Sequence, residues 1–334
     1  MRASEFAVAG VGAVALALAF PKPGQAWLAP VGAAGLFWAA GRLPWKRAFF
    51  AGWFAGAIFF AISFSWFSYT VGSFVGIFAP AIVLIPAFVQ ALSFGFTAAL
   101  ASFALRRGLA ALAPAAGAAA FTVFEALRAV GVVGIPFAQI GYSQTTTPLR
   151  VFAAYIGAYG VTFVVMALGA YVAYAILTKR YRTFAAAIAL TVVAWAGCYA
   201  AWPARRAHVP DIRVAAVQAN VTQSLKWHPL QARIAADRYL SMTQSLRVRH
   251  PQLVVLPETA IAEVLDRDPR LLVRLGTLAR SMPTTIVAGS LQDAGGQEYN
   301  ALYVFSENGM LQTVYRKRQL VPFAEAFPLQ QYLG

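Results

Sequence analysis

Long apolar runs separated by short polar loops fill the chain up to about residue 202. Crossing the hydrocarbon core of a bilayer takes about 20 mostly apolar residues of helix. Seven runs approach that length, at roughly residues 6–20, 25–41, 49–68, 79–104, 109–130, 151–178 and 184–202. The first is short enough for a signal peptide, but it has a thin basic start at Arg2 and a poor cleavage site around Phe20. We therefore expect a helical membrane bundle of about seven spans over residues 1–210.

The pattern changes after Pro203, where apolar and polar residues vary over shorter distances. Alternation at 212–218 is typical of a half-buried strand, and the apolar run at 253–256 is typical of a strand buried on both faces. The further elements expected are helices at 230–249 and 268–282 and strands at 284–288, 299–306 and 310–315. Asn308-Gly309 between the last two favours a hairpin. This order of elements predicts a soluble α/β layered domain over residues 211–334.

Composition supports a membrane protein and locates its positive charge. Hydrophobic residues make up 60% of the chain and charged residues 12%, about half the usual share. Residues 1–210 hold 14 Lys or Arg and two acids, against 13 and 10 in residues 211–334. The formal charge of +15 therefore lies mainly in loops between apolar runs, where it orients a membrane protein. We expect no nucleic-acid partner.

Basic residues occur in alternate loops of the expected bundle. They lie at 42–47, 106–107 and 179–182, whereas the loops between carry few, with Arg150 at the rim of one run. Loops rich in Lys and Arg remain in the cytoplasm. With seven spans, the N-terminus lies inside and everything after Trp202 lies outside.

Cysteine and histidine offer no metal site. The single cysteine, Cys198, lies in an apolar run, so no disulfide can form within the chain. His208, His228 and His250 share no metal-ligand spacing, and we interpret them as surface or interfacial residues. We expect neither a metal nor a cofactor.

Glu125 and Arg128 are charges inside an apolar run, three residues apart on one helical face. Two interpretations remain open: a buried pair that neutralises itself, or the lining of a polar cleft open to the outer leaflet. The stretch 134–144 (GIPFAQIGYSQ) is predicted to be a loop on the outer side, because Gly and Pro punctuate it. Gly157 and Gly160 lie on one face of the sixth run and Gly169 lies on another, and these small residues are expected to let helices pack closely.

Three charged side chains in the soluble domain suggest acid–base chemistry. Glu258 follows the buried strand at 253–256, and Lys317 and Glu325 flank the apolar segment 320–323. A carboxylate held at a strand end beside a lysine can move a proton during a reaction. A surface ion pair between Lys317 and Glu325 remains the plain alternative.

Several stretches resemble known motifs. Residues 255–260 (VLPETA), and 315–317 (YRK) followed by 320–325 (LVPFAE), resemble two motifs of the carbon–nitrogen hydrolase, or nitrilase, domain. Residues 218–220, 223–227, 299–300 and 134–144 are similar to stretches of bacterial apolipoprotein N-acyltransferases. The resemblance covers essentially the whole chain. It predicts a polytopic α-helical membrane bundle followed by an α/β nitrilase-like αββα sandwich.

The resemblance implies a Glu–Lys–Cys site. Glu258 is the implied general base, Lys317 would stabilise the oxyanion of a tetrahedral intermediate, and Glu325 would be a second carboxylate that orients Lys317. Trp227 would line the substrate entrance, with a core aromatic as the alternative. Asn300 is a second candidate for substrate binding, with a structural strand-end residue as the alternative.

The implied reaction moves an acyl chain from a membrane phospholipid, through a cysteine thioester, to the α-amine of a diacylated apolipoprotein. Resemblance places such an enzyme in the bacterial inner membrane, with its soluble domain on the periplasmic side. The alternation of basic loops predicts the same orientation.

The chain departs from the family pattern at the nucleophile. Only 17 residues follow Lys317, and none is cysteine, while Cys198 lies in an apolar run where a thiol is unreactive. We therefore expect a C-terminally truncated chain, with an incomplete domain, that is inactive alone. The alternative is a non-catalytic membrane protein that binds lipid or lipoprotein. Ala324 replaces the family's usual glycine, which weakens the case for Glu325.

Overall fold

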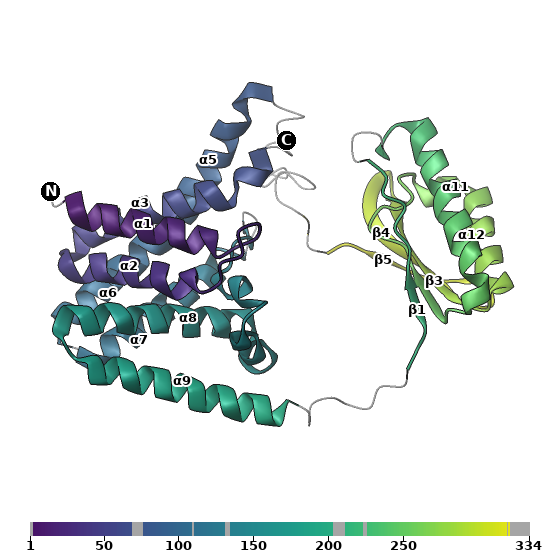
Figure 1. Cartoon of the computed structure of the whole chain (residues 1–334). Coiled ribbons are helices and arrows are strands. Elements are labelled where there is room, and N and C mark those ends of the chain that lie inside the picture. The colour runs from purple at the N-terminus through teal and green to yellow at the C-terminus, as the bar shows by residue number, and fades with distance from the viewer. Residues whose placement is uncertain are drawn as a thin grey trace. The chain divides into compact units, whose positions relative to one another are not determined.

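The computed structural model describes residues 3–68, 76–108, 110–130, 134–202, 211–222, 226–318 and 320. The chain divides into two compact units, one built on residues 1–207 and one formed by residues 208–327 (Figure 1). The first is helical, and the second contains a five-stranded sheet.

Eight α-helices are described in the helical unit, and four short 3-10 helices accompany them. The α-helices are α1 (Ala3–Leu18), α2 (Leu28–Arg42), α3 (Trp45–Ser63), α5 (Ala79–Gln90), α6 (Leu92–Arg106), α7 (Ala113–Leu127), α8 (Ala153–Thr178) and α9 (Tyr181–Ala201). The 3-10 helices are η1 (Gly76–Phe78), η2 (Ala110–Leu112), η3 (Ile140–Gln144) and η4 (Pro148–Phe152). In Figure 1, α1, α2 and α8 lie alongside one another, and α9 runs along one edge of the unit.

Each of the seven apolar runs contains a helix, but seven spans are not confirmed. Among the described residues, three helical segments are long and apolar enough to cross a membrane: Gly76–Arg106, Pro148–Thr178 and Tyr181–Ala201. Helices α1 and α7 are apolar but shorter. The run at 79–104 forms two helices, which meet at Ala91, rather than one. The unit is therefore mostly helical and apolar, and three of its segments have the length of a span.

Glycine allows close helix packing at only one of the three positions expected in α8. A Cβ on Gly169 of α8 would lie 2.6 Å from the carbonyl oxygen of Pro30 in α2, so this glycine lets the two backbones approach. Gly157 has φ +67° and no other part of the chain within 4 Å of where its Cβ would be, so it supplies a left-handed kink. A Cβ on Gly160 would meet the side chain of Ile156 in its own helix. The packing role predicted for Gly157 and Gly160 is wrong.

The second unit is built on a mixed sheet in the order β1-β2-β3-β4-β5. Its strands are β1 (Val214–Ala216), β2 (Leu253–Val255), β3 (Thr285–Ala294), β4 (Gln297–Phe305) and β5 (Leu311–Arg316). The first three are parallel, and the last three are antiparallel neighbours. Helices α11 (Pro229–Ser245) and α12 (Pro269–Ser281) lie side by side on one side of the sheet (Figure 1). This arrangement is consistent with the nitrilase-like fold that the resemblance predicts.

Local sequence chemistry explains most of these elements. Asp268 caps α12, because its carboxylate accepts hydrogen bonds from the backbone N–H groups of Arg270 and Leu271, both at 3.1 Å. The hairpin expected around Asn308-Gly309 is confirmed between β4 and β5. The structure adds a hairpin between β3 and β4, where Gly295 and Gly296 have φ +65° and +83°. Strand β3 continues six residues beyond Ala288, where the sequence pattern predicts that it ends.

The core of this unit lies between the sheet and its helices. Alternate residues of β3 and β4 are fully buried, among them Ile286, Ala288 and Tyr303. Helix α12 contributes Leu271 and Leu275, one turn apart on its apolar face. This packing fixes the strand ends from which the candidate site is built.

Candidate active site

Glu258 lies on the turn that leaves the C-terminal end of β2. The backbone N–H of Leu256 donates to the carbonyl of Val287 in β3 at 2.8 Å, which keeps the chain on the sheet just before the turn. Thr259 then adopts a left-handed conformation with φ +44°. The N–H of Ile261 donates to the carbonyl of Gly289 at 3.1 Å, so β3 holds the turn on both sides of Glu258.

Gly289 is the residue of β3 over which this turn crosses. A Cβ at Gly289 would overlap the carbonyl oxygen of Pro257 and lie 2.8 Å from the nitrogen of Thr259 and 2.9 Å from the Cα of Glu258. These are backbone atoms, which cannot rotate away. Glycine at this position therefore fixes where the Glu258 carboxylate can be.

Replacing Gly289 with alanine should move the turn and destabilise the second unit by about 1–3 kcal/mol, the usual cost of overpacking. Hydrogen exchange at the Ile261 amide should accelerate, because its acceptor is the Gly289 carbonyl. Gly197→Ala is the matched control, since a Cβ at Gly197 meets nothing within 4 Å. Wild-type exchange at Ile261 in the Gly289→Ala variant would contradict the assigned role.

Glu258, Lys317 and Asn300 form one polar cluster. The Lys317 Nζ lies 3.0 Å from the Glu258 Oε1, and the Asn300 Nδ2 donates to the same oxygen. Lys317 directly follows β5, and its backbone N–H donates to the Asn300 carbonyl at 2.8 Å. The β4–β5 register therefore places both side chains beside a carboxylate that lies 42 and 59 residues away in sequence. The Glu258 side chain is 61% exposed, so a substrate can reach it.

Lys226 is a further member of the site that the sequence analysis did not single out. Its Nζ donates to the Glu258 carbonyl at 3.2 Å and to the Thr259 Oγ1 at 2.5 Å. It lies 5.7 Å from the centroid of the Trp227 ring. Burial lowers the pKa of Lys226, and the Glu258 charge opposes that shift. The stretch 223–227 resembled the family, but no local pattern shows that its lysine reaches the turn at Glu258.

The rate at which Lys226 reacts with an acylating reagent rises with pH as the amine loses its proton. The midpoint of that rise should lie below the ordinary lysine pKa of about 10.4. Burial disfavours the charged form, so a larger share of the amine is neutral at a given pH. Acetylation rates measured by peptide mass spectrometry across a pH series give the midpoint for this residue. Glu258→Gln should lower the midpoint further, because it removes the charge that raises the pKa. A midpoint at or above 10.4 would count against a buried amine.

The structure thus brings together three of the five residues selected from the sequence: Glu258, Lys317 and Asn300. Asn300 lies within β4 rather than at its end. Trp227 is 52% exposed and is not the core aromatic of the alternative interpretation. Glu325 lies outside the described residues, so its position beside Lys317 stays a prediction. No group of three His, Cys, Asp or Glu side chains suited to a metal ion occurs in the described parts of the chain.

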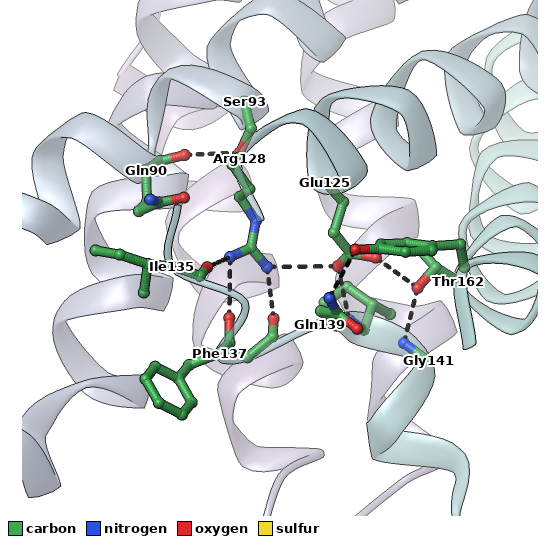
Figure 2. A network of polar contacts seen from close by, with 12 residues as sticks. Gln90, Ser93, Glu125, Arg128, Ile135, Phe137, Gln139, Gly141 and Thr162 are labelled. Carbon is green, nitrogen blue, oxygen red and sulfur yellow. Dashed lines mark hydrogen bonds and ion pairs between the residues drawn. The ribbon is translucent and has the colours of Figure 1, made fainter. Parts of the chain in front are cut away.

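A second polar cluster lies in the helical unit around Glu125 and Arg128 (Figure 2). The Arg128 guanidinium donates to the carbonyls of Ile135, Phe137 and Ala138 at 2.9–3.1 Å. Its Nη2 lies 3.7 Å from the Glu125 Oε1, and the two side chains are 7% and 1% exposed. Such burial agrees with a self-neutralising pair and not with the lining of an open cleft.

The Glu125 carboxylate ties the following segment to α8. Its Oε1 accepts from the Ile140 N–H at 2.7 Å, and its Oε2 accepts from the Thr162 hydroxyl at 2.6 Å. Thr162 in turn accepts from the Gly141 N–H at 2.8 Å. Figure 2 shows these groups converging on the segment 134–144, which begins without regular structure and ends in η3. The pair therefore anchors that loop.

Sequence comparisons agree with this two-part organisation. The family model of the apolipoprotein N-acyltransferase N-terminal domain matches residues 12–171, and that of carbon-nitrogen hydrolase matches residues 213–332. An apolipoprotein N-acyltransferase of Haemophilus ducreyi is 30% identical over 327 residues, which cover 95% of this chain and 64% of the relative. That of Azotobacter vinelandii is 34% identical, over 87% of this chain and 58% of the relative.

The chain spans less than two thirds of the length of these curated relatives. A further relative from Pseudomonas syringae pv. tomato is 29% identical and matches 98% of this chain and 66% of its own length. The matches run across both the helical unit and the sheet unit, in the same order. The chain is therefore similar to apolipoprotein N-acyltransferases along both units, and its second unit matches the carbon–nitrogen hydrolase model.

Proposed function

We propose that this chain supplies the membrane unit and the acid–base site of an enzyme that N-acylates lipoproteins. The acyl donor is a membrane phospholipid, and the acceptor is the N-terminal α-amine of a diacylated apolipoprotein. The observation that carries the proposal is the Glu258–Lys317–Asn300 cluster, in a carbon–nitrogen hydrolase domain that follows an apolar helical unit. The names of the relatives support the same class of reaction.

In the first half-reaction, a cysteine thiol loses its proton to Glu258, and its sulfur attacks the ester carbonyl of the phospholipid. The carbon–sulfur bond forms, the ester C–O bond breaks, and Glu258 returns the proton to the departing glycerol oxygen. This leaves a thioester and a lysophospholipid. Cys198 lies in the apolar helix α9, so we assign the nucleophile to a cysteine other than Cys198.

In the second half-reaction, the lipoprotein amine attacks the thioester carbon. The C–N bond forms and the C–S bond breaks, so that the sulfur leaves as the thiol and the amine proton passes through Glu258. In both halves the carbonyl oxygen gains negative charge. The Lys317 ammonium is the fixed positive group beside Glu258 that can stabilise it. Glu325 completes the proposal as the carboxylate that orients Lys317.

We place the reaction at the periplasmic surface of the bacterial inner membrane. The alternation of basic loops supports this orientation, because the loops at 42–47, 106–107 and 179–182 carry the Lys and Arg residues. Both proposed substrates are lipids or lipid-anchored proteins. A site at the membrane surface reaches both without removing their acyl chains from the bilayer.

A reconstituted transfer assay tests the function. The full-length protein is placed in vesicles with a fluorescent-acyl phospholipid and a synthetic diacylated lipopeptide. Fluorescence should move to the lipopeptide, and a lipopeptide whose α-amine is acetylated should accept none. Absence of transfer to the free amine, with the folded protein present, would contradict the proposal and favour a non-catalytic lipid-binding protein.

A further inference from the structure

A cavity of about 270 Å³ lies between η4 and the C-terminal half of α9 in the helical unit. Thr146, Thr147 and Arg150 line it on one side, and Trp195 and Tyr199 of α9 line it on the other. Ligand pockets for drug-sized molecules run from roughly 300 to 1,000 Å³, so this volume suits a small polar group. Nothing in the proposed acyl transfer uses these residues.

The α9 side of the cavity belongs to an exposed apolar helix. Helix α9 is long and apolar enough to cross a membrane, and none of its residues is buried in the protein. Leu190 and Val193 are about 70% exposed. An apolar helical surface of this length suits contact with the acyl chains of a bilayer. A molecule that occupies the cavity beside α9 therefore has acyl chains as its neighbours.

The aromatic wall of the cavity is held in place. Trp195 and Tyr199 lie one turn apart, with stacked rings whose centroids are 5.3 Å apart. The Trp195 indole N–H donates to the Pro148 carbonyl of η4 at 3.0 Å, which fixes α9 against the polar side. Trp and Tyr are enriched where a membrane helix meets the headgroup layer. The cavity therefore suits the level of lipid headgroups, at the end of the acyl chains that lie along α9.

Arg150 supplies the charge. It is exposed, and within the described residues its guanidinium has no ion pair and no side-chain hydrogen bond. It is also the one Lys or Arg between Arg128 and Lys179. A guanidinium presents several N–H donors in a planar fork that matches phosphate oxygens, and the Thr146 hydroxyl at the same rim offers a further donor.

We propose that the Arg150 cavity binds the phosphate of a bilayer glycerophospholipid whose acyl chains lie along α9. The guanidinium and the threonine hydroxyl bind the phosphate, and the Trp195–Tyr199 pair packs against the glycerol. This lipid is bound to the helical unit and is separate from the acyl donor. The proposal does not depend on the proposed acyl transfer.

Native mass spectrometry of the full chain tests the site, with detergent-solubilised protein titrated against phosphatidylglycerol. Arg150→Gln should weaken binding of the first lipid about tenfold, because one charged phosphate contact is lost. Arg47→Gln is the matched control, since it removes another exposed arginine of the same unit. It should leave the affinity unchanged. Circular dichroism checks that both variants keep their helices.

A second arm separates a lipid from a free anion by titrating inorganic phosphate in place of phosphatidylglycerol. Inorganic phosphate should bind at least tenfold more weakly than the lipid, because it gains no contact with α9. Equal lipid affinity in wild type and Arg150→Gln would overturn the proposal. So would an equal loss in Arg47→Gln, which would show only a general attraction to basic residues, or Arg150-dependent binding of phosphate without binding of lipid.

Discussion

Glu258→Gln is expected to lower the rate of acyl transfer by about 10³-fold, within the usual contribution of a positioned general base. The substitution keeps the size of the side chain and an oxygen that can accept from Asn300 and Lys317. It removes the group that takes the thiol proton. The initial rate of transfer from phospholipid to lipopeptide in vesicles gives the size of the effect.

Glu298→Gln is the matched control for this substitution. Glu298 is a half-exposed carboxylate in β4, two residues from Asn300, and it pairs with Arg267 at 3.0 Å. Its loss should change the transfer rate less than twofold, and both variants should melt within a few degrees of wild type. A Glu258→Gln variant that folds and keeps more than a tenth of the rate would show that another group is the base.

Glu125→Ala is expected to destabilise the helical unit by about 3–5 kcal/mol, the usual cost of leaving a buried charge without its partner. The Arg128 side chain is 7% exposed and would lose its counter-charge. The Ile140 N–H and the Thr162 hydroxyl would also lose their acceptor, so the segment 134–144 would detach from α8 (Figure 2). Unfolding in a denaturing detergent, followed by circular dichroism, measures the loss.

Glu125→Gln provides the graded comparison. Its amide oxygen can still accept one of the two hydrogen bonds, but its NH₂ group cannot accept the other and carries no charge. We expect a loss between those of wild type and Glu125→Ala. If Glu125→Ala costs less than about 1 kcal/mol, the pair is not the anchor of this loop.

Elements that depend on neighbouring residues were predictable from the sequence. The Asp268 cap of α12 and the Asn308-Gly309 hairpin each arise from the chemistry of a few adjacent residues. Contacts between distant segments were not predictable in the same way. The pattern of small residues in α8 shows that close packing can occur, but not that α2 lies against Gly169 rather than Gly157.

The candidate site shows the same limit. The resemblance selected Glu258 and Lys317, and the structure places their charged groups 3.0 Å apart. The resemblance could not show that the β4–β5 register brings Asn300 to the same carboxylate oxygen. Lys226 was missed because its role depends on a turn that lies 32 residues further along the chain. A lysine next to a tryptophan has no pattern that indicates such a contact.

The most direct measurement is the mass of the amino-terminal peptide of a lipoprotein from cells depleted of their own N-acyltransferase. The full-length protein is expressed in those cells, either as wild type or with Glu258→Gln. With wild type, the lipidated cysteine should gain one acyl chain on its α-amine, and with the variant it should keep a free amine. A free amine in both cases, with the protein folded in the membrane, would contradict the proposed acyl transfer.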